Sequence, residues 1–264
     1  MAKAKVNGIE IYYEIHGKGE PLVLVLGFSM NHFAWGPLIE AFAEKFQVIL
    51  FDNRGAGESE APDEPYSIDQ MAKDTLGLLD ELGIEEALFL GHSMGSLVCQ
   101  VIAYIAKERV KKMVLSGTFS KRRQTTAFAF DLYGKLYSEG LPYDRLIELF
   151  MPFVFSDTFL SNPENIDRLR KLLKEDPCPI TLAGYRGQGE ALNQFDSEDF
   201  LKKIKVPTLV IGYEKDICTF LDSAILVASK IPNAEFSLME GVGHTGFAEQ
   251  PKVFLQKTIP FLSS

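Results

Sequence analysis

The pentapeptide Gly91-His92-Ser93-Met94-Gly95 follows a short apolar run, Ala87–Leu90, and leads into a stretch with a helical pattern, Ser96–Val101. This order predicts a strand, a sharp turn and a helix. A G-x-S-x-G sequence in that setting is typical of a nucleophile elbow, a turn so tight that the residues two positions from the serine need to lack bulk. The turn holds the serine hydroxyl clear of the sheet. We therefore take Ser93 as a candidate nucleophile, in preference to a glycine-bracketed turn without chemistry.

The composition fits one large α/β domain, or one such domain with an insertion. The chain has 264 residues, of which 46% are hydrophobic, and a formal net charge of -9. An acidic chain argues against binding to nucleic acid or to an anionic membrane, because phosphate groups are bound by clustered Lys and Arg. The one dense basic cluster, Lys121–Arg123, is short, and we interpret it as the solvated start of a helix.

The cysteines predict neither a disulfide framework nor a zinc site. Cys99, Cys178 and Cys218 show no C-x-x-C spacing, so we expect reduced thiols. Residues 1–8 hold no apolar stretch that fits a signal peptide, and no run reaches the roughly 18 to 20 apolar residues of a membrane span. We expect a soluble, cytoplasmic protein that needs no metal and no cofactor and has no membrane partner.

Continuous apolar runs predict the buried strands of a parallel sheet. They are Leu22–Leu26, Val48–Phe51, Ala87–Leu90, Met113–Ser116, Pro207–Gly212 and Glu235–Met239. The alternating segment Ile9–Ile15 predicts one arm of an antiparallel pair at the sheet edge. Helical patterns lie at about residues 36–44, 67–82, 220–231 and 253–262, with Ser67 as the N-cap of the second. This alternation predicts an α/β fold with a doubly wound, mostly parallel sheet.

A different pattern fills the segment between about residues 118 and 199, where aromatic and apolar residues crowd helix-like stretches without a buried strand. We expect four prolines to divide it into short helices: Pro152, Pro163, Pro177 and Pro179. We therefore divide the chain into an α/β core, residues 1–118 and 200–264, and an inserted helical cap, residues 119–199. The aromatic content favours a lid that walls an apolar pocket, and a second helical domain with its own role is the alternative.

The stretch Asp52–Ser59 contains two glycines after a predicted strand, which would suit a phosphate cradle. The dinucleotide-binding fingerprint G-x-G-x-x-G opens a helix, whereas this stretch continues into a loop, Ala61–Pro65. We therefore reject the cradle. We interpret Asp52 and Arg54 as an internal ion pair or a hydrogen-bond clamp that holds the loop.

A serine nucleophile needs a neighbouring base, here a histidine that a carboxylate orients. In open α/β sheets the chemistry lies beyond the carboxyl ends of the strands. His244 stands in that position, in a glycine-rich loop after the last predicted strand. His92 is adjacent to Ser93 in sequence, but we expect its side chain to point away from the elbow and assign it a structural role.

The acid is predicted from the loop after the Pro207–Gly212 strand. Asp216 lies in this loop, so Ser, Asp and His follow one another in that order along the chain. Glu214, Asp222 and Glu240 are competitors. Glu214 is the strongest of them, since it lies in the same loop.

The oxyanion that forms on an attacked carbonyl needs backbone N–H donors already in place, and loss of one donor typically costs about 100- to 1,000-fold in rate. Met94, the residue after the nucleophile, is expected to supply the first donor. Phe28 follows the Leu22–Leu26 strand and is placed for the second.

Taken together, these segments resemble the α/β-hydrolase superfamily over essentially the whole chain, including the order Ser-Asp-His. The matching segments are Leu26–Phe28, Asp52–Ser59, the elbow, the strand that leads to Asp216, and Gly243-His244 with Glu249 and Pro251 downstream. The resemblance implies an eight-stranded sheet with a cap, and a cofactor-free serine hydrolase similar to the capped carboxylesterases and 3-oxoadipate enol-lactonases. One departure is Leu26, which replaces the histidine that members usually carry, and it leaves His32 as a candidate to line the site.

The resemblance implies a small apolar ester or lactone as the substrate, and two other functions stay open. The same triad can cleave a carbon–carbon bond in a β-diketone, and a small-molecule receptor can retain the triad in a capped pocket. Haloalkane dehalogenation is disfavoured, because that chemistry needs a carboxylate nucleophile and position 93 is serine. The oligomeric state is also open, with a homodimer as one option.

Overall fold

The computed structural model describes residues 2–264 and contains one sheet of eight strands. The strands are β1 (Ala2–Val6), β2 (Ile9–His16), β3 (Glu20–Val25), β4 (Phe46–Phe51), β5 (Ala87–His92), β6 (Val110–Ser116), β7 (Thr208–Tyr213) and β8 (Glu235–Met239). Their order across the sheet is β1-β2-β4-β3-β5-β6-β7-β8. β2 pairs antiparallel with β1 and β4, and all other neighbours are parallel. The predicted doubly wound, mostly parallel sheet is therefore confirmed.

The antiparallel edge contains a strand for which the sequence gives little signal. β1 pairs with β2 through a turn at Asn7 and Gly8, where φ is 49° and 89°. The side chains of β1 alternate between exposed and half-buried up to Val6. Its lysine-containing sequence thus lacks the apolar run that marks the inner strands.

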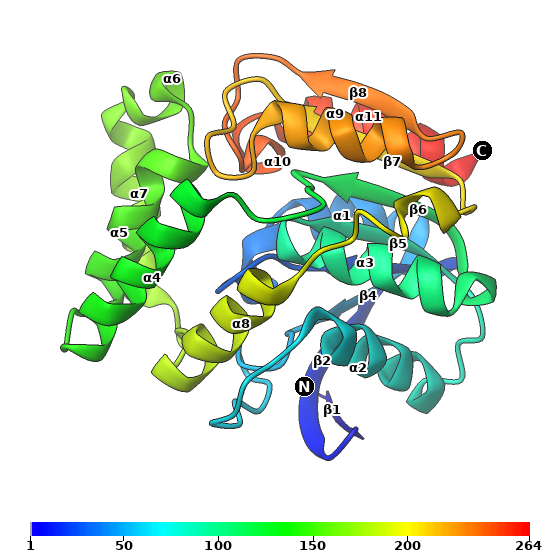
Figure 1. The fold of residues 1–264 in the computed structure, drawn as a ribbon, viewed down its shortest axis with the longest axis horizontal. Helices are drawn as coiled ribbons and strands as arrows, with labels where there is room; N and C mark the ends of the chain where they lie inside the picture. The colour runs from blue at the N-terminus through cyan, green and yellow to red at the C-terminus, as the bar shows by residue number, and fades with distance from the viewer. Residues whose placement is uncertain (1) are drawn as a thin grey trace.

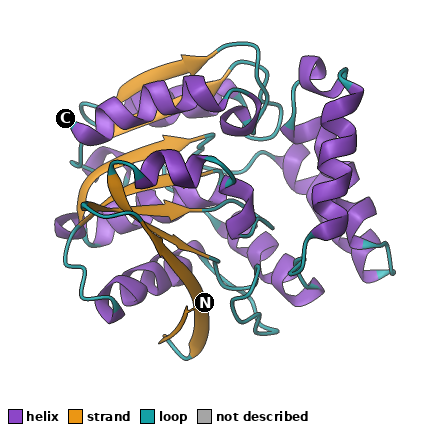
Figure 2. Cartoon of the chain, turned by 180° about the vertical axis from the view of Figure 1, so that it is seen from behind, coloured by secondary structure: helices purple, strands orange, loops and turns teal. Residues whose placement is uncertain are grey.

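Helices cover both faces of the sheet, as Figures 1 and 2 show. Those of the core are α1 (Leu38–Ala43), α2 (Ile68–Glu81), α3 (Met94–Ile105), α9 (Leu221–Lys230), α10 (Gly246–Glu249) and α11 (Pro251–Ser263). Short 3-10 helices lie at His32–Trp35, Lys107–Arg109 and Leu201–Lys203. One apolar cluster joins α2, α3 and α9 to the sheet, and a second joins α1 and α11 to it. Val23 of β3 belongs to the first cluster and Leu24 to the second, which explains why the inner strands contain continuous apolar runs.

The predicted N-cap of α2 is confirmed, because Ser67 Oγ accepts a hydrogen bond from Gln70 N at 3.1 Å. This bond satisfies one of the backbone donors that the first turn of a helix leaves unpaired.

The helical insert follows β6 and precedes β7 in the sequence. In space it lies beside the sheet (Figure 1). It consists of α4 (Gln124–Ser138), α5 (Tyr143–Val154), α6 (Asp157–Leu160), α7 (Pro163–Glu175) and α8 (Leu182–Gln194). Pro163 begins α7, and Pro177 and Pro179 lie between α7 and α8. Pro152, however, lies inside α5, so the prediction that it separates two helices is wrong. A proline here removes one backbone N–H donor from the helix, yet α5 continues through it to Val154.

Loops that carry the candidate residues leave the carboxyl ends of four parallel strands. Phe28 follows β3, Ser93 follows β5, Asp216 follows β7 and His244 follows β8. The ring of Phe28 packs against Phe130, Phe150 and Tyr185 of the insert, so the insert covers this edge of the sheet. Within residues 2–264, no helix combines the length and the apolar character needed to cross a membrane.

Candidate active site

The elbow is built from the end of β5, a strained serine and the first turn of α3. Ser93 has φ 52° and ψ -122°, a conformation that costs free energy in a non-glycine residue and is concentrated at functional sites. A Cβ on Gly91 would lie 2.4 Å from Gly95 O, and a Cβ on Gly95 would lie 2.1 Å from Val25 O. These backbone contacts explain why both flanking residues are glycine.

Asp216 and His244 form a buried pair. His244 Nδ1 lies 2.8 Å from Asp216 Oδ2. The other carboxylate oxygen accepts hydrogen bonds from the backbone N–H groups of Cys218 and Thr219, both at 2.8 Å. Burial alone would raise the pKa of Asp216, but the charge and hydrogen bond of His244, together with Thr219, lower it to about 2. The carboxylate is therefore ionised and can accept the Nδ1–H of His244.

His244 packs against a second histidine. The ring centroids of His92 and His244 are 4.8 Å apart. Gly117 leaves room for His244, since a Cβ there would lie 3.0 Å from His244 Cε1. His92 is fully buried, with Nδ1 3.1 Å from Ser116 Oγ, and its burial and the neighbouring His244 hold its pKa well below the usual range. His92 is thus a neutral ring that supports His244.

Ser93 and His244 both lie at the carboxyl edge of the sheet, after β5 and β8, but they are not hydrogen-bonded. No hydrogen bond of Ser93 Oγ is found among the residues that the structure describes. Catalytic hydrogen bonds are often long in sites without substrate and shorten in the complex. The arrangement therefore allows His244 to act on Ser93 once a substrate is bound.

Two backbone N–H groups are free to stabilise an oxyanion. Met94 is the first residue of α3, so its N–H has no partner within the helix. Phe28 follows Gly27, and a Cβ on Gly27 would lie 3.1 Å from Ser93 Cβ, which places this loop next to the nucleophile. Within residues 2–264 neither N–H donates a hydrogen bond.

Gln188 of α8 holds the Phe28 loop, and no sequence pattern indicates this role. Its Oε1 accepts from Ser29 N at 2.8 Å, and its Nε2 donates to Arg54 O at 2.9 Å. Gln188 is fully buried, and each half of its amide has a partner. One side chain of the cap thus fixes two loops of the core.

The loop that carries His244 is also tied to the cap. Thr245 N donates to Val154 O at 2.8 Å. Glu249 accepts hydrogen bonds from Ser156 N and Gly243 N, both at 2.9 Å. The cap therefore contacts the loops on both sides of Ser93.

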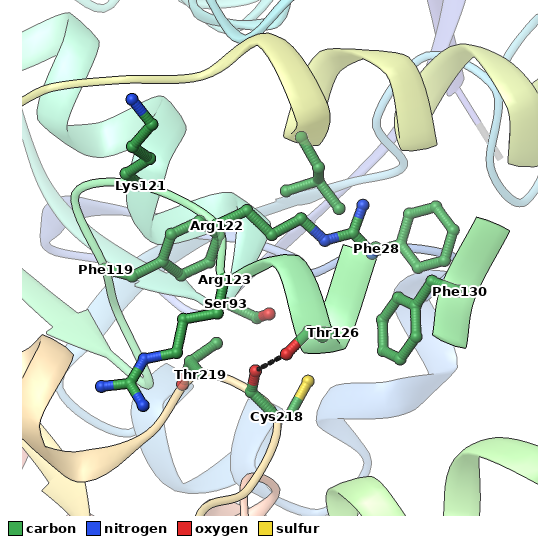
Figure 3. Close-up of a pocket in the computed structure, with 11 residues that line it drawn as sticks. Phe28, Ser93, Phe119, Lys121, Arg122, Arg123, Thr126, Phe130, Cys218 and Thr219 are labelled. Atoms are coloured by element: carbon green, nitrogen blue, oxygen red, sulfur yellow. Dashed lines mark hydrogen bonds between the residues drawn. The ribbon is translucent and has the colours of Figure 1, made fainter. Parts of the chain in front are cut away.

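A pocket lies beside Ser93, and Figure 3 shows the side chains around it. Its lining combines apolar side chains, among them Phe28, Phe119, Phe130 and Leu192, with the basic residues Lys121–Arg123. The cavity volume is about 30 Å³, whereas one buried water needs about 10 to 15 Å³. A substrate larger than a few atoms therefore enters only if side chains or cap helices move.

The competing acids lie elsewhere. Glu214 accepts a hydrogen bond from Gly241 N at 2.8 Å and pairs with Lys215. Asp222 pairs with Arg123. Of the candidate acids, Asp216 is the one that the structure brings to His244.

Residues 20–251 match the family described as alpha/beta hydrolase fold. The chain belongs to this family. A protein of Azorhizobium caulinodans with the provisional name carbamate hydrolase RutD is 30% identical, and the alignment covers 99% of this chain and 98% of that protein. The 3-oxoadipate enol-lactonase 2 of Acinetobacter baylyi is 29% identical over 93% of this chain and 90% of its own length.

Solved structures similar to this α/β hydrolase include an enol-lactonase and an esterase. The enol-lactonase from Burkholderia xenovorans has a TM-score of 0.90 and 26% identity, and the match covers 100% of both chains. The thermophilic esterase from Thermogutta terrifontis has a TM-score of 0.88 and 25% identity, with 99% of this chain and 97% of the esterase covered.

In this α/β hydrolase, Leu26 belongs to the core and not to the pocket. Its side chain is buried in the cluster on the α1 and α11 face, and its carbonyl accepts a hydrogen bond from Asn53 Nδ2 at 3.0 Å. His32 does not line the pocket beside Ser93 either. Its backbone N and its ring Nδ1 lie 2.7 and 2.9 Å from the carboxylate of Asp52.

The predicted ion pair between Asp52 and Arg54 is wrong, while the predicted hydrogen-bond clamp is present. Asp52 binds His32 and accepts from Glu58 N at 2.9 Å. Arg54 makes a bidentate pair with Asp74 of α2. Each residue holds the loop through a partner that lies far away in sequence.

The described residues contain no group of three or more His, Cys, Asp and Glu side chains arranged to hold a metal ion. The three cysteines are free thiols, and Cys99 and Cys218 are buried.

Proposed function

We propose that this α/β hydrolase is a cofactor-free serine hydrolase of small carboxylic esters or lactones. The observation that carries the proposal is the buried pair of Asp216 and His244, which lies at the same carboxyl edge of the sheet as the strained Ser93. The enol-lactonase and the esterase among its relatives support carboxylic esters and lactones as the substrate class.

Acylation begins when His244 Nε2 takes the proton of Ser93 Oγ and Oγ attacks the carbonyl carbon. Asp216 accepts the Nδ1–H, which fixes the ring and stabilises the imidazolium. The carbonyl oxygen becomes an oxyanion that the N–H groups of Phe28 and Met94 stabilise. The carbon–oxygen bond of the ester then breaks, and His244 gives its proton to the leaving alkoxide, which departs as an alcohol.

Deacylation repeats these steps with water as the nucleophile. His244 takes a proton from water, and the hydroxide attacks the acyl carbon. The bond between the acyl carbon and Ser93 Oγ then breaks, His244 returns the proton to Oγ, and the acid is released. With a lactone, the alcohol and the acid stay joined in one product.

Hydrolysis of p-nitrophenyl acetate and butyrate tests the proposal. We expect Ser93→Ala to lower kcat by about 10⁶-fold, as the loss of the nucleophile does in a serine protease. Ser229→Ala, which changes an exposed serine on α9, is the matched control and should keep the activity. A fluorophosphonate should form a phosphorus–oxygen bond with Ser93 Oγ and release fluoride, and mass spectrometry of the peptides locates it. Wild-type activity in Ser93→Ala would refute the mechanism.

A carbamate is a second candidate substrate, because one relative carries the provisional name carbamate hydrolase. Carbamates, β-diketones and esters with matched side chains therefore belong in one screen. Turnover far below about 1 per second on all of them, against the 1 to 1,000 per second of typical enzymes, would favour the receptor alternative.

A further inference from the structure

The basic cluster Lys121–Arg123 contains one residue that differs from its neighbours. Lys121 pairs with Asp196 and Arg123 pairs with Asp222, and the side chains of Lys121 and Arg123 are 62% and 42% exposed. Arg122 between them is only 9% exposed. The interpretation of the cluster as a solvated helix start is therefore correct for its two ends and wrong for Arg122.

Arg122 has no carboxylate partner among residues 2–264. Its Nη1 donates to Asn193 Oδ1 at 2.6 Å, and its guanidinium carbon lies 4.9 Å from the ring centroid of Phe130. Its Nη2 is buried and has no hydrogen-bond partner in this part of the chain. The exposed Asp131 is connected to Arg122 only through Asn193, whose Nδ2 donates to Asp131 Oδ1 at 3.2 Å.

Arg54 shows how the same chain treats a buried arginine with a structural role. Arg54 is 1% exposed, and two of its nitrogens donate to the carboxylate of Asp74. Buried charges are normally paired in this way, because an unpaired one loses its hydration without compensation. Burial lowers the pKa of Arg122, yet a guanidinium stays protonated in proteins. A buried cation with an unused donor thus lacks the anion that Arg54 has.

Arg122 is one of the residues that line the pocket beside Ser93, together with Lys121 and Arg123. Figure 3 shows the Arg122 guanidinium next to the rings of Phe28 and Phe130.

We propose that Arg122 binds a carboxylate of the substrate, so that the preferred esters or lactones carry a free carboxylate in addition to the bond that is cleaved. This inference rests on the proposed function. It assigns Arg122 as a specificity-determining residue, since its charge adds nothing to the binding of a neutral ester.

Matched pairs of esters test the inference. The p-nitrophenyl monoesters of succinic, glutaric and adipic acid carry a terminal carboxylate, and p-nitrophenyl butyrate, valerate and hexanoate are neutral counterparts. We expect wild-type kcat/KM to favour the carboxylate member of at least one pair. In Arg122→Met, kcat/KM for that member should fall by about 10- to 150-fold, the value of a hydrogen bond to a charged group. For the neutral esters, kcat/KM of Arg122→Met should stay close to the wild-type value.

Two further variants complete the comparison. Arg186→Met removes the same charge from an exposed position on α8 and should leave the preference unchanged. Arg122→Lys keeps the charge without the planar fork of the guanidinium, so its preference for the carboxylate ester should lie between those of wild type and Arg122→Met. If Arg122→Met does not fold, the lower preference of Arg122→Lys relative to wild type tests the inference. Equal losses on both members of each pair, or no change in preference, would overturn the inference.

A binding measurement separates this inference from the proposed function. Calorimetry with glutarate and adipate on Ser93→Ala needs no turnover. If no ester is hydrolysed but either dicarboxylate binds, and does so only with Arg122 present, the proposed function fails and the carboxylate site stands. If esters are hydrolysed but neither dicarboxylate binds and the ester pairs show no preference, the carboxylate site is refuted and the hydrolase remains.

Discussion

Asp216 is almost completely buried and still ionised, and its charge fixes which nitrogen of His244 carries the proton. A carboxylate can only accept hydrogen bonds, so the proton of the imidazole is kept on Nδ1. Nε2 is then left without a proton, as the proposed role of His244 as the base for Ser93 requires. Thr219 contributes through both its backbone N–H and its hydroxyl, which donate to the two oxygens of Asp216.

We predict that Asp216→Asn lowers kcat by about 10⁴-fold, the loss seen for the same change in a serine protease. The amide can donate to Nδ1 and so favours the wrong tautomer of His244, while its size is unchanged. The assay is kcat on p-nitrophenyl butyrate with circular dichroism as a check of folding. Glu214→Gln changes the exposed acid of the same loop and should stay close to wild type. Equal effects of the two substitutions would remove Asp216 from its proposed role.

At the level of secondary structure, the predictable part of this protein is the part with local signals. The inner strands are recognisable because both of their faces are buried and each contains a continuous apolar run. The elbow is recognisable because only glycine fits at positions 91 and 95. β1 lacks such a run. Pro152 misleads because α5 continues through it, although a proline at that position removes a backbone donor.

Residues whose role depends on distant contacts could not be predicted in the same way. Arg122 and Arg123 are identical in type and adjacent, but one is buried and the other exposed. Gln188 lies between two glycines in a polar stretch of sequence, and only the packing of α8 on the core shows that it is buried. The partners of Asp52 and Arg54 also depend on which loops the fold brings together.

The packing of α8 against the core predicts an effect of Gln188 on catalysis. Gln188→Met keeps the length of the side chain but removes both hydrogen bonds, which leaves Ser29 N and Arg54 O without these partners. We expect a loss of about 1 to 3 kcal/mol in the free energy of unfolding. We also expect a fall of up to about 100-fold in kcat, since a small shift of a positioning element can cost that much.

The control for this change is Gln194→Met, which alters an exposed glutamine on the same helix whose Nε2 donates to Glu190 Oε1. Urea unfolding gives the stability, and kcat and KM are measured separately. A positioning role lowers kcat more than it raises KM. A loss of stability with unchanged kcat would show that Gln188 supports the fold and not the Phe28 loop.

On the scale of the whole molecule, the antiparallel edge of the sheet is joined to the loops of the site by a cluster of titratable groups. Asp52 follows β4, His32 opens the 3-10 helix after β3, and Glu14 lies in β2. His32 Nδ1 lies 2.9 Å from Asp52 Oδ2, and His32 Nε2 lies 4.0 Å from Glu14 Oε1. The ring also packs on Tyr12 at 4.7 Å between centroids.

This cluster predicts a pH-dependent part of the stability. Burial would lower the pKa of His32, but Asp52, Glu14 and Glu58 outweigh it, and the pKa is raised. A raised pKa means that the folded protein holds the proton more tightly than the unfolded chain. The stabilisation is therefore complete below the pKa of a histidine in the unfolded chain, about 6.5. It is lost as the pH rises through the pKa of His32 in the folded protein.

We predict that His32→Gln is more destabilising at about pH 5.5 than at about pH 9, because the variant lacks the charge that the carboxylates stabilise at low pH. Urea unfolding of both proteins across this range measures the difference in the free energy of unfolding at each pH. NMR titration of the His32 ring gives its pKa directly and should place it above 6.5, the ordinary value for histidine. Asp52→Asn should move that titration to lower pH, because it removes the carboxylate closest to Nδ1. Parallel stability curves for wild type and His32→Gln would show that His32 packs as a neutral ring and that this edge of the sheet does not respond to pH.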